Sequence, residues 1–335
     1  MKQIAEHRRI DFDTFHNELL PAGQPLVVRS IVKDWPAVKQ CAASPEAACA
    51  YLSRLAIGKP VRTLAAPPEA EGRFFYNDTL TGVNFKQGQF PLREVLKELQ
   101  SMADVVTSHS IAVQALSIRD ELPDFEKQNP NDLLDDDIAP SMWISNRGKV
   151  APHFDEDKNL ACVVTGRREF VLFPPEQLAN LYIGPMLTTP GGMPISLVDP
   201  WNPDLEKFPR FTDALATAQT TTLEPGDAIF IPSLWWHGVR SLESFNVLVN
   251  YWWDGRSDYG VSSYDSLLHA MFSIAGLDEA QRRAWRDYFD HFVFQTGDDP
   301  AAHLPDSVED IVTSLNPGQA RKARMILSQR LIWDE

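Results

Sequence analysis

Apolar side chains gather in short runs between positions 110 and 255, and turn residues end each run. The runs are rich in Val, Ile, Phe and Trp and are separated by Gly, Pro or Asn-Arg-Gly turns, which is typical of strands. Many short strands in this arrangement predict a sandwich or a jelly-roll barrel. The predicted strands are 142–145, 161–165, 169–173, 220–223, 228–231 and 245–252.

The N-terminal third alternates between helical patterns and one strand. Ser44 before Pro45 supplies an N-cap and a first-turn proline, which indicates the start of a helix. Leu92, Val95 and Leu99 fall on one side of another helix. The predicted elements are a helix at 10–20, a strand at 25–29, and helices at 44–55 and 91–99.

Beyond residue 254 the pattern becomes helical. A wide apolar stripe with i, i+3, i+4, i+7 and i+8 spacing predicts a helix over 277–294 and consists of Trp285, Tyr288, Phe289, Phe292 and Val293. A weaker stripe near the end consists of Ala323, Ile326, Leu327 and Leu331. A barrel does not need such helices for its own closure. They either cover the barrel or form an interface with a second copy.

Composition limits the partners. The chain has 335 residues, of which 44% are hydrophobic, enough for a sizeable core. Its net charge of −15 argues against DNA and disfavours RNA, because binding phosphates requires a concentrated basic surface. The same charge would steer basic rather than acidic macromolecules toward the protein.

Cysteine usage and hydropathy indicate the compartment. Cys41, Cys49 and Cys162 are too few and too scattered for a disulfide framework or a C-x-x-C metal site. The N-terminus lacks the apolar core of a signal peptide, and no apolar stretch is long enough to cross a membrane. We therefore expect a cytoplasmic protein without a membrane association.

His153, Asp155 and His237 are the candidate metal ligands. In an extended segment, residues two apart point to the same face, and Pro152 favours extended geometry before it. His237 is expected to end the strand that follows the Pro225-Gly226 turn. His-x-Asp alone also fits a surface pair, but the second histidine in a β-rich region favours a metal site. Two imidazoles and one carboxylate form the facial triad of non-haem Fe(II) oxygenases.

Several motifs in matching order resemble the JmjC-type, cupin-like 2-oxoglutarate dioxygenases, most closely their asparaginyl hydroxylase branch. They are His153-Phe154-Asp155-Glu156-Asp157-Lys158-Asn159, Phe173-Pro174-Pro175-Glu176-Gln177, Val198-Asp199-Pro200-Trp201-Asn202-Pro203-Asp204, Phe208-Pro209, Pro225-Gly226-Asp227, Trp235-Trp236-His237 and Val249-Asn250-Tyr251-Trp252. The resemblance is firm over 140–255 and looser before it. It implies a mainly β fold, a double-stranded β-helix (jelly-roll or cupin) with helical flanks and C-terminal helices.

The resemblance also implies a domain organisation and cofactors. We expect an N-terminal α/β flank at 1–109, the catalytic barrel at 110–256 and a C-terminal helical region at 257–335. Because some family members dimerise through C-terminal helices, a homodimer through this region gains support. The triad would hold Fe(II), which takes 2-oxoglutarate at two positions and O2 at the third.

Further site residues follow position by position from the resemblance. Arg168 falls where the family has a basic residue that pairs with the distal carboxylate of 2-oxoglutarate, and a guanidinium can bind a carboxylate bidentately. Asn159 and Asn250 match asparagines of the co-substrate pocket. Trp252 and Gln114 match residues near the substrate, although a strand tryptophan is as often only packing. A solvated Arg168 beside Arg167 is the bland alternative.

The chain also departs from the pattern. Val150 stands where the family has a hydroxyl donor, and a supporting tyrosine is replaced near Ala112, so Arg168 or Ser145 would have to contribute more to anchoring. The segment 194–197 replaces the polar pair that orients asparagine in the most similar branch, so we expect a different substrate.

The resulting hypothesis is an Fe(II)- and 2-oxoglutarate-dependent dioxygenase, a hydroxylase of a protein or peptide side chain that releases succinate and CO2. Two alternatives stay open. One is a metal-binding cupin that acts as a scaffold without turnover. The other is a cupin metalloenzyme that does not use 2-oxoglutarate.

Overall fold

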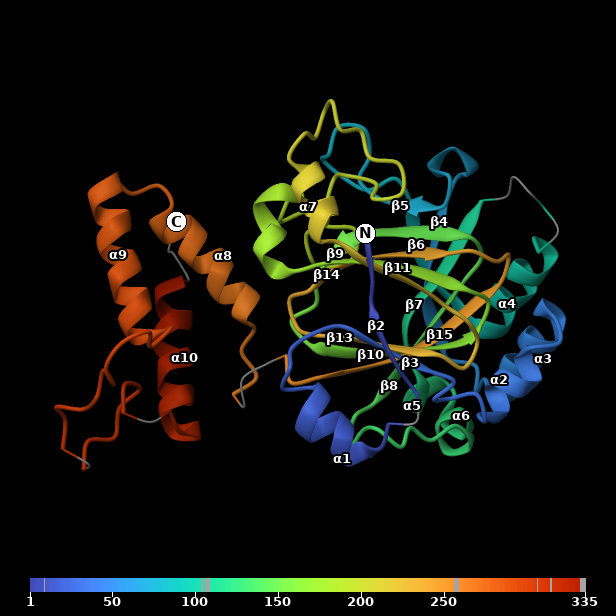
Figure 1. Cartoon of the computed structure of the whole chain (residues 1–335), viewed down its shortest axis with the longest axis horizontal. Helices are drawn as coiled ribbons and strands as arrows, with labels where there is room; N and C mark the ends of the chain where they lie inside the picture. The colour runs from blue at the N-terminus through green and yellow to red at the C-terminus, as the bar shows by residue number, and fades with distance from the viewer. Residues whose placement is uncertain are drawn as a thin grey trace. The chain divides into compact units, whose positions relative to one another are not determined.

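The computed structural model describes residues 1–8, 10–103, 105, 109–255, 259–305, 307–313 and 315–331. The chain divides into two compact units, Met1–Gly255 and Arg256–Glu335 (Figure 1). The boundary predicted between 256 and 257 lies outside the described residues.

The secondary structure alternates short strands and helices in the first unit and is helical in the second. The strands are β1 Lys2–Gln3, β2 Ala5–Arg8, β3 Leu26–Arg29, β4 Pro60–Ala66, β5 Arg73–Phe74, β6 Lys86–Pro91, β7 Ser110–Ser117, β8 Pro140–Ser145, β9 Gly148–His153, β10 Lys158–Thr165, β11 Arg168–Phe173, β12 Gln219–Leu223, β13 Ala228–Ile231, β14 Trp236–Ser241 and β15 Asn246–Trp253. The helices are α1 Phe12–Thr14, α2 Pro36–Cys41, α3 Pro45–Leu55, α4 Leu92–Ser101, α5 Ile118–Glu121, α6 Pro123–Gln128, α7 Phe211–Thr217, α8 Ser263–Ile274, α9 Glu279–Phe292 and α10 Pro317–Leu331, with a π-helix at Phe15–Leu19 and 3-10 helices at Pro68–Ala70 and Pro175–Asn180.

Two facing sheets form a jelly roll. The smaller sheet has the order β1-β12-β11-β14-β9-β5, and the larger has the order β2-β3-β13-β10-β15-β8-β7-β4-β6. The strands from β8 to β15 supply β9, β14, β11 and β12 to one sheet and β8, β15, β10 and β13 to the other, which is the double-stranded β-helix (Figure 1). The predicted fold class is confirmed.

The side chains of the central strand β10 pack alternately into two separate hydrophobic cores. Its residues Leu160, Cys162 and Val164 point to the outer side of the larger sheet, where they pack in the core shared with the helices. Ala161 and Val163 point the other way, into the core between the two sheets. Because successive side chains of a strand face opposite sides, one nearly continuous apolar run closes both layers.

Helices cover the outer face of the larger sheet, as Figure 1 shows for α2, α3 and α4. The predicted helix start at Ser44 is confirmed, since its side chain accepts a hydrogen bond from the Ala47 amide at 3.2 Å. Leu92, Val95 and Leu99 are buried along α4, as their spacing predicted.

Several elements differ from the sequence-based expectation. Residues 10–20 do not form one regular helix, because α1 ends at Thr14 and the chain continues as the π-helix. The strands β1 and β2 were not predicted, and they pair in parallel with β12 and β3. Such pairing joins segments far apart in the sequence, so no local pattern announces it.

The C-terminal unit contains α8, α9 and α10. The predicted helix at 277–294 is confirmed as α9, and Asp278 forms a capping box with Gln281 at its start. Its stripe residues Trp285, Tyr288 and Phe292 are exposed.

The cysteines and the helices were both considered in the sequence analysis. Cys41, Cys49 and Cys162 are buried and unpaired. In the part of the chain that the structure describes, every helix is too short or too polar to traverse a bilayer.

Candidate active site

The structure brings the three predicted metal ligands together between the sheets. His153 ends β9 and His237 lies opposite it on β14, so the two imidazoles are cross-strand neighbours with ring centroids 4.3 Å apart. Asp155 follows β9, and its Oδ2 lies 3.7 Å from Nε2 of His237. The ligand atoms of all three residues lie within 4.8 Å of one another.

The backbone before His237 differs from the prediction. Instead of ending a single strand, His237 is the second residue of β14, because β13 ends at Ile231 and a turn follows. Leu234 adopts a left-handed conformation in this turn (φ 64°), which is costly for a branched side chain. Its amide donates to the Asp155 carbonyl at 2.9 Å. The turn thereby ties the carboxylate segment to the start of β14.

Both histidines present the same nitrogen to the site. Nδ1 of His153 lies 3.0 Å from the Ala151 carbonyl, and Nδ1 of His237 lies 3.1 Å from the Trp235 carbonyl. Because a carbonyl can only accept, each Nδ1 carries the proton and each Nε2 keeps its lone pair for a metal. Burial, together with the neighbouring His153, lowers the pKa of His237 to about 4. Its imidazole is therefore neutral near pH 7, as metal coordination requires.

The carboxylate of Asp155 is oriented by neighbouring donors. Trp252 donates from Nε1 to Asp155 Oδ2 at 3.1 Å, and Asn159 donates from Nδ2 to the same oxygen at 3.4 Å. Trp252 lines the cavity and also holds the candidate ligand Asp155, and its predicted place near the substrate stays a prediction. Such outer donors fix the direction of a ligand and typically raise metal affinity by about 10- to 100-fold.

The polar contacts continue away from Asp155. Asn250 donates from Nδ2 to Asn159 Oδ1 at 3.4 Å and accepts from Trp143 Nε1 at 2.8 Å. Trp143 packs edge-on against Trp252, with ring centroids 5.8 Å apart. The two predicted asparagines thus belong to one network that ends on the carboxylate.

All eight predicted site residues line one cavity of about 230 Å³. They are His153, Asp155, His237, Arg168, Asn159, Asn250, Trp252 and Gln114. Trp143 and Arg62 also line it and were not predicted as site residues. Trp143 lies in a predicted strand, but only the cross-strand pairing shows which way it points. Arg62 lies on β4, which no sequence pattern had indicated.

Arg168 is buried and unpaired. The side chain starts β11, retains 6% of its exposure, and its Nε and Nη2 have no partner among the described residues. Burial lowers the pKa of its guanidinium to about 10. Arg167 is exposed and pairs with Glu243 at 2.6 Å. A buried cation is costly unless an anion meets it, so the fork of Arg168 fits a carboxylate ligand.

A bulge brings Gln114 into the cavity. The register between β7 and β8 shifts between Val113 and Leu116, and Ala115 has a left-handed φ of 48°. Gln114 and Ala115 both line the cavity as a result. Bulges commonly redirect side chains beside active sites in this way.

The positions that depart from the family pattern are also explained. Val150 lines the cavity without offering a hydrogen bond. The Ser145 hydroxyl lies 3.5 Å from that of Ser241 and is not part of the cavity wall. In the segment 194–197, Ile195 faces the cavity, while the Ser196 hydroxyl donates to the Leu181 carbonyl at 2.5 Å.

The chain is similar to a known domain family and to several known proteins. The model of the cupin-like domain family matches residues 12–259. Lysine-specific demethylase JMJ31 of Arabidopsis thaliana is 39% identical over 35% of this chain and 21% of its own length. Human bifunctional peptidase and (3S)-lysyl hydroxylase JMJD7 is 26% identical over 79% of this chain and 87% of its own. Lysine-specific demethylase 8 of Xenopus tropicalis is 27% identical over 71% of this chain and 50% of its own. The chain thus spans most of one relative but half or less of the other two.

Proposed function

The chain belongs to the cupin-like domain family, and on that premise we propose that it is an Fe(II)- and 2-oxoglutarate-dependent dioxygenase that hydroxylates a protein side chain, with release of succinate and CO2. One observation carries the proposal. The His153, Asp155 and His237 cluster shares its cavity with Arg168, a buried guanidinium that has no counter-ion among the described residues.

Each residue of the site would have a separate role. Nε2 of His153, Nε2 of His237 and the Asp155 carboxylate would hold the ion on one face, leaving its other face open. Iron, when bound with 2-oxoglutarate and O2, supplies the oxidising power. Arg168 would bind the distal carboxylate of the co-substrate through two parallel N–H donors. Trp252 and Asn159 keep the Asp155 carboxylate directed at the ion.

The substrate proposal is a protein side chain. The names of the similar proteins speak of lysyl hydroxylation and lysine demethylation. The narrower resemblance to asparaginyl hydroxylases does not extend to the substrate. The segment 194–197 presents the apolar Ile195 to the cavity and uses its Ser196 hydroxyl within the protein.

Turnover of the co-substrate without a prime substrate tests the activity. Wild-type protein with Fe(II), 2-oxoglutarate and O2 is expected to form succinate slowly, and anaerobic protein to form none. A protein that binds the metal but forms no succinate under any condition would be the scaffold cupin. Absence of 2-oxoglutarate binding in anaerobic calorimetry would indicate the cupin metalloenzyme that does not use it. The oxidised residue would appear in mass spectrometry as a gain of one oxygen.

For the C-terminal unit we propose a homodimer. The α9 stripe leaves Trp285 44%, Tyr288 57% and Phe292 47% exposed, which is unusual for clustered aromatic side chains. Pairing with the same stripe of a second copy would bury it through a two-fold interface. Replacing Trp285 and Phe292 with Ser should convert the dimer to a monomer in sedimentation, whereas Arg283→Ser on the same helix should not. A monomeric wild-type protein would refute the dimer.

A further inference from the structure

One charged side chain of the cavity has no role in the proposed reaction. Among the described residues that line the cavity, the charged groups other than the histidines are Asp155, Arg168 and Arg62. Asp155 is assigned to the metal and Arg168 to the co-substrate. Arg62 is an exposed residue of β4 in the larger sheet, at the wall of the cavity, and it is unassigned.

Arg62 carries a positive charge without a counter-ion. Its Nη2 donates to the carboxamide Oε1 of Gln87 at 3.3 Å, and among the described residues no carboxylate forms an ion pair with it. By contrast, Lys149 is paired with Asp199 at 3.0 Å, and Arg240 is paired with Glu169. A carboxamide is uncharged and does not neutralise the guanidinium, so Arg62 can still bind an anion.

The surroundings of Arg62 in the cavity match a peptide. Gln114, raised into the cavity by its bulge, offers both a donor and an acceptor to a backbone or side-chain amide. Phe74, Met193 and Ile195 provide apolar wall. Once Asp155 serves the metal, none of the other described lining residues is an acid that could receive an ammonium group. A lysyl side chain would bring a like charge into this space.

We propose that Arg62 selects a substrate that carries a carboxylate at, or directly beside, the residue to be oxidised, and that it disfavours a lysyl side chain. The proposal rests on the proposed function and adds the substrate class. It separates this chain from the lysine-directed activities named for its relatives.

The overall charge does not oppose this preference. At physiological ionic strength the Debye length is about 8 Å, so most of the −15 net charge is screened from a carboxylate held next to Arg62. Net charge affects the encounter rate, whereas contacts inside the cavity decide which side chain stays bound. A substrate with a local carboxylate in an otherwise neutral or basic segment satisfies both conditions.

Two degenerate peptide pools test the proposal. They differ only in a fixed Asp or a fixed Lys beside a randomised central residue. Binding is measured by anaerobic calorimetry to the 335-residue protein loaded with Mn(II) and 2-oxoglutarate. Wild type should bind the Asp pool more tightly. Arg62→Gln should remove most of that preference, and Arg62→Glu should shift the ratio toward the Lys pool by about tenfold, because attraction becomes repulsion.

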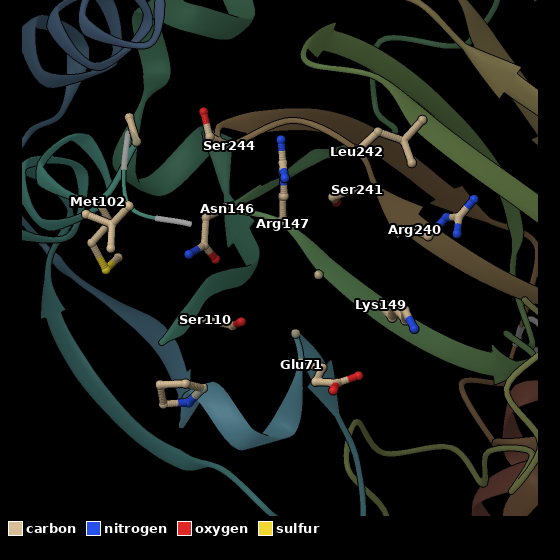
Figure 2. Close-up of a pocket in the computed structure, with 15 residues that line it drawn as sticks. Glu71, Met102, Ser110, Asn146, Arg147, Lys149, Arg240, Ser241, Leu242 and Ser244 are labelled. Atoms are coloured by element: carbon tan, nitrogen blue, oxygen red, sulfur yellow. The ribbon is translucent and has the colours of Figure 1, made fainter. Parts of the chain in front are cut away.

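Arg147 provides the matched control. It lines a second cavity of about 640 Å³, formed by the β8–β9 turn and the end of β14 (Figure 2). This second cavity shares no lining residue with the first. Arg147→Glu changes the net charge by the same amount as Arg62→Glu, and it should keep the wild-type ratio.

The proposal would be overturned if wild type bound both peptide pools equally, if Arg62→Glu kept the wild-type ratio of affinities, or if Arg147→Glu shifted that ratio as much as Arg62→Glu. A raised Kd for 2-oxoglutarate in Arg62→Gln would also overturn it, because Arg62 would then bind the co-substrate. Pool discrimination in a wild-type protein that forms no succinate would support the role of Arg62 while contradicting the oxygenase assignment. The two hypotheses therefore fail separately.

Discussion

Replacing Asp155 with Ala is expected to abolish both Fe(II) binding and succinate formation. The carboxylate is the anionic group of the candidate metal cluster, and its removal leaves only the two imidazoles. Loss of a supporting hydrogen bond to a ligand already lowers metal affinity by about 10- to 100-fold, so loss of the ligand itself should exceed about 100-fold. Anaerobic titration with Fe(II) measures the affinity, and succinate formation measures turnover.

Asp213→Ala is the matched control for this experiment. Asp213 is an exposed aspartate of α7 that does not line the cavity, so its loss should leave metal binding at the wild-type level. Thermal unfolding of both variants shows whether either has lost its fold. Wild-type Fe(II) affinity and turnover in a folded Asp155→Ala protein would refute the metal site.

Replacing Arg168 with Met should raise the apparent KM for 2-oxoglutarate by about thirtyfold or more. Removing one partner of a buried, hydrogen-bonded charge pair costs at least about 2–5 kcal/mol, and each 1.4 kcal/mol is about tenfold. Met is apolar and of similar length, so the variant removes the charge while filling much of the space. Steady-state succinate formation over a range of 2-oxoglutarate concentrations measures this effect.

The same variant has a second expected signature. Arg168 is buried without a partner among the described residues, which is destabilising. Arg168→Met should therefore melt at a higher temperature than wild type, while 2-oxoglutarate no longer stabilises it. Arg167→Met, which removes the exposed neighbour, should change neither the KM nor the stabilisation by 2-oxoglutarate. An unchanged KM in Arg168→Met would show that another residue anchors the co-substrate.

Local patterns predicted much of the framework correctly. The α3 start at Ser44 and the buried face of α4 depend on neighbouring residues alone, and both were visible in the sequence. The central strands β10, β11 and β13 were visible for the same reason, since they are buried apolar runs. Short or polar strands were missed. β9 and β6 are largely polar or half-buried, and only their partners make them strands.

Some residues of the site were predicted from the sequence, and others were not. The residue pattern pointed to the three candidate ligands and the resemblance to Arg168, because metal and carboxylate chemistry restricts the residue types that can serve. The resemblance placed Trp252 near the substrate, and the structure adds that its indole donates to Asp155. It offered no sign of Arg62, because nothing near that residue in the sequence indicates that β4 approaches the cavity.

The sequence by itself therefore determined the chemical repertoire: two imidazoles, a carboxylate, a guanidinium and the alternating apolar runs of a β barrel. The tertiary structure decided how that repertoire is used. It buried Arg168 but not Arg167, set His237 opposite His153, and joined Trp143 through two asparagines to Asp155. Side-chain chemistry belongs to single residues, whereas burial and hydrogen-bond partners depend on the register between strands that lie far apart along the chain.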